Sequence, residues 1–287
     1  MSRFTAGLRA ALLAFALFAC APEPLDADPA IWRVEGPDGQ KAWLFGTIHA
    51  ADRPLNWRSP PVDAALVAAD EIIVEVADMD QANLARRFAA LSRTSGLPPL
   101  IDRVPSPERA ALAARLEDLD IERGAFAGVE TWAAALTLAR AAADHADPDH
   151  GVDRAVIAAA AGKPVRELEG ADAQLRIFDA LPEREQFDLL GAVLDGAENS
   201  EDASLVRSWA RGDMTAITRE TRRGLLADPE LRAALYTGRN RRWTATIERR
   251  IREGHHPFVA VGAAHLAGPD GLPAMLEARG FKVTRIG

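Results

Sequence analysis

The chain uses one pattern twice, near its two ends, and this repetition constrains the fold more than any other feature. The apolar run Trp43–Phe45 leads into Gly46-Thr-Ile-His49, and the apolar run Phe258–Val261 leads into Gly262-Ala-Ala-His265. Short apolar runs bounded by glycine are typical of buried strands. A helical pattern and a second strand pattern follow each His. Strands that alternate with helices in this way indicate an α/β fold.

Local signals give the bounds of the elements at the two ends. The composition of Gly36-Pro-Asp-Gly39 is typical of a turn and joins the first two strands into a hairpin. Ser59 followed by Pro60 marks the start of a helix. The predicted elements are strands over residues 31–35, 41–45, 71–76, 258–261 and 281–286, and helices over residues 59–70 and 269–279.

The middle of the chain, residues 80–252, is predicted to be mainly helical. It is rich in Ala, Leu, Glu and Arg, with apolar residues at helical spacing. One interruption, Pro164–Leu168, reads as a strand that ends at Glu169. The predicted fold is therefore α/β, with a mixed, largely parallel sheet as its core and a large helical insertion. We treat residues 30–287 as a single domain.

Four side chains follow the carboxyl ends of predicted strands, where ligands bind in open parallel sheets. They are His49, Glu75, Glu169 and His265. The glycines at 46 and 262 permit a tight turn or a close backbone approach that aims each imidazole inward, and we place Gly46 and Gly262 in the substrate-binding region. Two imidazoles with one or two carboxylates, if they meet, form a set that divalent transition metals accept.

These residues also have ordinary structural explanations. A His after a strand is often a loop residue bonded to a backbone carbonyl, and Arg166 is close enough to Glu169 to pair with it. His255 and His256 follow Gly254 in a loop that ends a helix, which favours a cationic helix cap over a metal site. The arginines at 241, 242, 249, 250 and 252 are interpreted as a solvated helix face.

The sequence of the N-terminus predicts that the protein is exported from the cytoplasm. Arg3 and Arg9 precede the apolar stretch Ala10–Ala19, which is shorter than the roughly 20 residues that a membrane-spanning helix needs. We interpret residues 1–19 as a signal peptide. The single cysteine, Cys20, follows Leu-Phe-Ala, similar to a bacterial lipoprotein cleavage box, which favours a lipid anchor at Cys20 and an extended tether over residues 20–29. The alternative is cleavage after Ala21 and a soluble periplasmic protein.

The net charge and the absence of several motifs argue against several classes of protein function. A formal net charge of -8 and a sequence pI of about 5.4 argue against a partner made of duplex nucleic acid. The chain contains no His-Glu-x-x-His, Gly-x-Ser-x-Gly, Walker loop or Gly-x-Gly-x-x-Gly sequence. Familiar proteases, hydrolases and nucleotide binders therefore have no support from motifs.

An ordered series of segments over about residues 30–287 resembles the TraB/GumN family. The matching segments are Trp43–His49, Glu71–Val76, Gly151-Val-Asp153, Gly162-Lys-Pro-Val165 with Leu168-Glu169-Gly170 and Gln174, Trp209 with Gly212-Asp213, Arg239-Asn240 with Trp243, and Val261–His265. The series is more specific than either Gly-x-x-His alone.

The resemblance implies a fold similar to the erythromycin esterase and ChaN group, and an activity like that of the Tiki proteins, membrane-tethered metalloproteases that use manganese or cobalt. By this similarity His49 and His265 bind a metal, with Glu75 and Glu169 as carboxylate partners. Arg239 and Asn240 are then expected to bind an oxyanion or substrate group.

Two functions are expected. The first is an exported or lipid-anchored metal-dependent hydrolase, a peptidase in which Glu75, Glu169 and Arg239 are catalytic and His49, His265 and Glu75 hold manganese, cobalt or zinc. The second is a non-catalytic envelope protein that binds a peptide or small molecule in the same crevice, which suits the TraB-like relatives that limit pheromone signalling. The sequence does not decide which glutamate is a ligand.

Overall fold

A computed structural model describes residues 23–143, 146–195 and 197–287. The predicted signal peptide and Cys20 lie outside these residues. The centre of the fold is a six-stranded sheet with strand order β6-β5-β7-β3-β2-β8. Its strands are β2 (Ile31–Glu35), β3 (Lys41–Thr47), β5 (Glu71–Val74), β6 (Val165–Glu167), β7 (Pro257–Gly262) and β8 (Lys282–Arg285).

The sheet is mixed and largely parallel, which confirms the predicted fold class. Strands β6, β5, β7 and β3 pair in parallel, whereas β2 pairs antiparallel with both β3 and β8. The two strands of the repeated pattern are direct neighbours, with Gly46 opposite Val261 and Thr47 opposite Gly262. The loops that carry His49 and His265 therefore leave the same edge of the sheet side by side.

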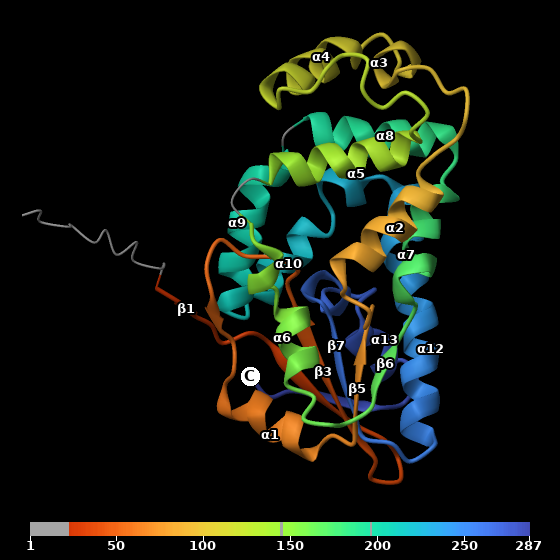
Figure 1. The fold of residues 1–287 in the computed structure, drawn as a ribbon. Helices are drawn as coiled ribbons and strands as arrows, with labels where there is room; N and C mark the ends of the chain where they lie inside the picture. Colours follow the sequence, from red (N-terminus) through yellow and green to blue (C-terminus); the bar gives the residue numbers. More distant parts are fainter. Residues whose placement is uncertain (1–22, 144–145, 196) are drawn as a thin grey trace, which may run out of the picture.

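Helices cover both faces of the sheet and build a separate layer beyond it (Figure 1). They are α1 (Pro60–Ala68), α2 (Gln81–Leu91), α3 (Leu100–Arg103), α4 (Arg109–Asp118), α5 (Thr131–Ala142), α6 (Val152–Ala158), α7 (Gly170–Asp179), α8 (Glu183–Leu194), α9 (Ala197–Ala210), α10 (Met214–Glu220), α11 (Pro229–Arg232), α12 (Gly238–Arg252) and α13 (Leu272–Glu277). The long helical stretch between β5 and β7, interrupted by β6, is the predicted insertion.

Three apolar clusters follow this layering. One face of the sheet packs against α1 and α6, together with Trp57 and Trp209. The other face packs against α12 and α13 through side chains such as Trp243 and Leu272. A third cluster, around Trp132, lies among α3, α4, α5, α8 and α11 and contains no sheet residue. Fully burying one such large side chain contributes about 1.5–3 kcal/mol.

Two local predictions need correction. The second half of the predicted tether packs on the protein: β1 (Leu25–Asp26) pairs in parallel with β4 (Leu55–Asn56), and the Asp28 N–H donates to the Ala210 carbonyl. The predicted helix over residues 269–279 is shorter, because Gly268 takes a left-handed φ of +70° and a turn precedes α13. In the described residues, no helix combines the length and apolarity needed to cross a membrane.

Candidate active site

His49 lies at the exposed rim of the site, just beyond β3, with 68% of its side chain accessible. Its Nδ1 is 2.5 Å from Oδ2 of Asp153, which lies on α6. Glycine at 151 permits this contact between segments, because a Cβ there would lie 2.4 Å from the His49 carbonyl oxygen. Asp153 thus orients the ring through Nδ1 and leaves Nε2 free to face the site.

His265 lies on the buried floor of the site, in the short turn η4 (Ala263–Leu266). Its Nδ1 is 2.6 Å from Oδ1 of Asn240, and Nη1 of Arg239 donates to its Nε2 at 3.2 Å. The Asn240 Nδ2 donates to the carbonyls of His265 and Asp270, so its Oδ1 is the atom that accepts from the ring. His265 is therefore a neutral imidazole with its proton on Nδ1.

Aromatic rings fix the orientation of His265. The rings of Tyr236 and Trp243 lie with their centroids 5.6 and 4.5 Å from the imidazole. The Tyr236 hydroxyl donates to the Ala267 carbonyl, and burial raises the pKa of Tyr236 to about 12. Tyr236 therefore stays protonated at neutral pH and supports the site by packing rather than by proton transfer.

Glu75 lies directly beyond β5 and is buried. The Gly262 N–H donates to its Oε1 at 2.8 Å, and Nη2 of Arg239 donates to its Oε2 at 2.6 Å. Burial alone would raise the pKa of Glu75, but electrostatic interactions with the neighbouring His265, Arg239 and His49 side chains outweigh it and lower this pKa to about 2. Glu75 is therefore a fixed carboxylate at neutral pH.

Glu169 reaches the same place from β6. The N–H groups of Glu169 and Gly170 donate to the Glu75 carbonyl, which brings the two glutamates together. The Glu169 carboxylate then forms a two-bond ion pair with Nε and Nη2 of Arg239. Burial raises the pKa of Glu169, in contrast to that of Glu75. The expected Arg166–Glu169 pair is wrong, because Arg166 donates to Glu71 instead.

Arg239 holds these groups together from α12. Its guanidinium is buried and lies 4.5 Å from the centroid of the Trp243 ring. It donates to both glutamates, to His265 Nε2 and, through Nη1, to the Leu235 carbonyl. A guanidinium has five N–H donors, and these five contacts account for all of them. In this arrangement Arg239 has no N–H left for a substrate oxyanion, which differs from the role expected from the sequence.

Two other expected substrate-binding residues also have structural partners. Asn240 is fully buried and its amide is engaged with His265 and Asp270, so it orients the imidazole instead of facing a substrate. Gly46 lies where a Cβ would be 3.0 Å from the Cβ of Ala263, and its carbonyl accepts from the Trp209 indole. Glycine at 46 therefore serves close packing between β3 and η4.

Gly262 is the expected glycine that opens onto the site. A Cβ on Gly262 would lie 3.3 Å from Glu75 Oε1 and 3.8 Å from both His49 Nε2 and His265 Cδ2. The two imidazoles and one carboxylate thus surround a single point, from three different strands. A side chain at position 262 would enter the space between the two rings and Glu75, so glycine keeps that space open for a ligand.

The chemistry of these donors fits a divalent cation. Asp153, Glu75 and Glu169 contribute three carboxylates against the single guanidinium of Arg239. The charge of Asp153 raises the pKa of His49 to about 9, so the cluster has a net charge of -1 at neutral pH and of -2 once a cation displaces the proton of His49. Both rings are bonded through Nδ1, the arrangement that orients metal-binding histidines. In the described residues, however, these donors do not form a set whose ligand atoms all lie within 4.8 Å of one another. Coordination by both rings requires Arg239 Nη1 to release His265 Nε2.

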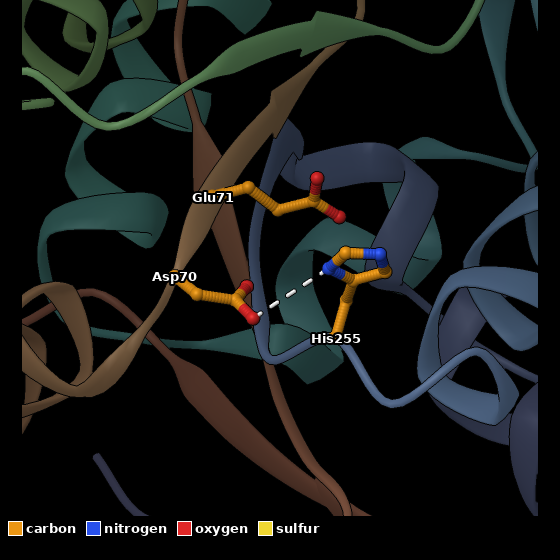
Figure 2. A group of neighbouring side chains, drawn as sticks. All are labelled: Asp70, Glu71 and His255. Carbon is orange, nitrogen blue, oxygen red and sulfur yellow. Dashed lines mark ion pairs between the residues drawn. The ribbon is translucent and has the colours of Figure 1, made fainter.

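A different group of donors does meet that spacing, at the opposite edge of the sheet. Figure 2 shows Asp70, Glu71 and His255, with His255 Nδ1 at 3.6 Å from an Asp70 oxygen. Glu71 already accepts two bonds from Arg250 and one from Arg166. Two guanidiniums beside the buried carboxylate neutralise it and would repel a cation. This group is an ion-pair network, and Arg250 is not the purely solvated residue expected from the sequence.

Asp153 is the functional candidate that sequence reasoning did not select. It was recognised only within the segment Gly151-Val-Asp153 of the family resemblance. Its Oδ2 orients His49, while its Oδ1 is buried without a hydrogen-bond donor among the residues that the structure describes. The sequence feature that points to Asp153 is Gly151, because a glycine there permits close approach to the His49 backbone.

Comparison with known proteins agrees with the resemblance. Residues 30–285 match the family model described as "TraB/PrgY/gumN family". The chain is similar to "Uncharacterized protein YbaP" of Shigella flexneri, with 26% identity over 251 residues that cover 84% of this chain and 89% of that protein. No solved structure matches the chain. The finer likeness to the erythromycin esterase and ChaN group stays a prediction.

Proposed function

Since the chain belongs to the TraB/PrgY/gumN family, we propose that it is a metal-dependent hydrolase that cleaves peptides or similar amides outside the cytoplasm. The observation that carries this proposal is the approach of His49, Glu75 and His265 to one point beside Gly262. Manganese, cobalt or zinc suits such nitrogen and oxygen donors. When bound, the ion supplies a Lewis acid that polarises the amide carbonyl and lowers the pKa of water.

The two imidazoles and Glu75 are the proposed ligands. Nδ1 of each ring is bonded to Asp153 or Asn240, so Nε2 is the nitrogen left for coordination. Glu75 remains ionised at neutral pH and is fixed by the Gly262 N–H, which suits a ligand better than a proton acceptor. The exposed ring of His49 supports an entrance for substrate on its side of the site.

Glu169 is the proposed proton-transfer group. Its raised pKa makes it a stronger base than Glu75, and its carboxylate lies next to Glu75 on the same guanidinium. In this role Glu169 accepts a proton from the attacking water and delivers it to the leaving amine. Arg239 positions both carboxylates and offsets their repulsion.

Export and membrane attachment belong to the same proposal. The basic and apolar residues at 1–19 support a signal peptide, and Cys20 supports lipid attachment in the periplasm or envelope. A hydrolase with this location would meet secreted or envelope peptides.

A second candidate is a protein that binds such a peptide without cleaving it. The observation that favours it is the complete use of Arg239, whose five donors are all bonded within the cluster. In this state every N–H donor of Arg239 is bonded within the cluster, and the side chain of His49 is exposed at the rim of the site.

A peptide library separates the two functions. We expect the purified mature chain, incubated with peptides and manganese, cobalt or zinc, to generate new peptide N-termini that mass spectrometry identifies and that EDTA suppresses. The control is the same incubation without protein. Recovery of intact peptides bound to the protein, with no new N-termini for any of the three metals, would support binding and contradict hydrolysis.

A further inference from the structure

A second group of oxygen donors lies in the helical layer, away from the sheet. Glu185 and Asp188 are three residues apart on α8, and Asp228 precedes α11. One carboxylate oxygen from each side chain lies within 4.8 Å of the others. Residues three apart on a helix share one face, so α8 presents two of the carboxylates toward the third.

Glu185 is the unusual member of this group. It is only 4% exposed, and its Oε2 is buried without a hydrogen-bond donor among the residues that the structure describes. Leaving a buried carboxylate oxygen unbonded is costly. Its neighbours add to that cost: the charges of Asp228, Asp188 and Glu230 oppose ionisation of Glu185 and, with burial as the main cause, raise its pKa.

Little positive charge compensates this cluster. Arg184 is 3.7 Å from an Asp188 oxygen, but its side chain is 76% exposed and the pair is therefore weak. Asp228 uses only Oδ1 to accept the N–H groups of Glu230 and Leu231, which leaves Oδ2 for another partner. A cation that binds all three side chains would satisfy the buried Glu185 oxygen.

We propose that Glu185, Asp188 and Asp228 form a calcium site. The donors are all carboxylate oxygens, which favour hard cations, and Asp188 is exposed enough to adjust its position. Calcium accepts six to eight oxygen ligands in flexible geometry and suits such a set better than magnesium does. The cation would connect α8 to α11, from which the chain continues without a break into α12 and Arg239. Its role is to stabilise the helical layer rather than to take part in hydrolysis.

The test is a calcium titration of the mature chain by thermal unfolding and calorimetry. Because calcium binds only the folded chain, saturating CaCl2 is expected to raise the Tm by roughly 3 °C or more above the value in EDTA. Calorimetry should give one calcium per chain. Glu185→Gln should remove this response while keeping an equal or higher Tm in EDTA, since it deletes a buried charge among like charges.

Two further variants make the test specific. Asp188→Asn, at an exposed position that folding tolerates, should weaken calcium binding at least tenfold. Glu183→Gln is the matched control, because it removes an exposed carboxylate from the same helix and should leave the response intact. A protonated Glu185 that needs no cation predicts no saturable calcium response, and either that result or an equal response in Glu185→Gln would overturn the proposal.

This site is independent of the proposed function. A chain with both His49→Ala and His265→Ala should retain the calcium-dependent rise in Tm, whether or not the wild-type chain cleaves peptides. Loss of the calcium response in that variant would place calcium at the histidine site and contradict the assignment to Glu185.

Discussion

Replacing Arg239 with Met should lower the free energy of unfolding by about 3–5 kcal/mol, because it leaves the carboxylates of Glu75 and Glu169 buried beside each other without a cation. Met retains much of the apolar contact with Trp243, so the loss reports mainly on charge. A chain of this size should show a Tm lower by roughly 6–20 °C. Thermal and urea unfolding are measured in EDTA, so that no divalent ion replaces the guanidinium.

The control for this variant is Arg241→Met, which removes an exposed arginine from the same helix. Its effect should stay within about 0.5 kcal/mol. Adding Glu169→Gln to Arg239→Met should recover part of the stability, because one of the two unpaired charges is then removed. If Arg239→Met unfolds at the same temperature as Arg241→Met, the buried ion-pair cluster does not exist as described.

Replacing either His49 or His265 with Ala is expected to reduce kcat/KM for metal-dependent peptide cleavage at least about 1,000-fold, which corresponds to about 4 kcal/mol of transition-state stabilisation. Each substitution removes one of the two imidazoles beside Gly262. Removal of Asp153 or Asn240, which orient the rings through Nδ1, should have smaller effects of about 10–100-fold on metal affinity.

His150→Ala is the matched control for the histidine variants. His150 is far from His49 along the chain but contacts the same loop, because its Nδ1 lies 3.3 Å from the Ala51 carbonyl, outside the cluster. Cleavage and metal affinity should remain within about twofold of wild type, and circular dichroism should show that all variants fold. Equal activity of His49→Ala, His265→Ala and His150→Ala would remove both imidazoles from the mechanism.

The sequence could predict that the two Gly-x-x-His segments lie side by side, but it could predict only some of the contacts around them. Two apolar runs of strand length, each ended by Gly-x-x-His, were enough to place His49 and His265 beyond parallel strands, and β3 and β7 are indeed adjacent. Strand periodicity also located Glu75 and Glu169 at strand ends. These predictions succeed because strand direction and strand ends are local properties of the sequence.

The roles of Arg239 and Asn240 could not be predicted in the same way. Both lie on α12, and helical periodicity does not reveal that neighbouring polar residues point inward to two glutamates and an imidazole. Asp153 contacts His49, which lies 104 positions earlier in the sequence. The start of α6 can approach the His49 backbone this closely only because residue 151 is glycine. The sequence suggests a pair between Arg166 and Glu169 because the two are neighbours along the chain. In the structure Arg166 instead donates to Glu71, on the adjacent strand β5, and distance along the sequence does not reveal this contact.

The most direct test of the central claim is the position of a bound ion. Crystals of the mature chain soaked in manganese should show one anomalous peak at about 2.0–2.3 Å from Nε2 of both His49 and His265. The peak should lie on the side of Gly262 toward which a Cβ would point in any other residue. The Arg239 guanidinium should then no longer contact His265 Nε2. A well-occupied peak elsewhere, or one bound to a single imidazole with Arg239 still on His265, would contradict the account.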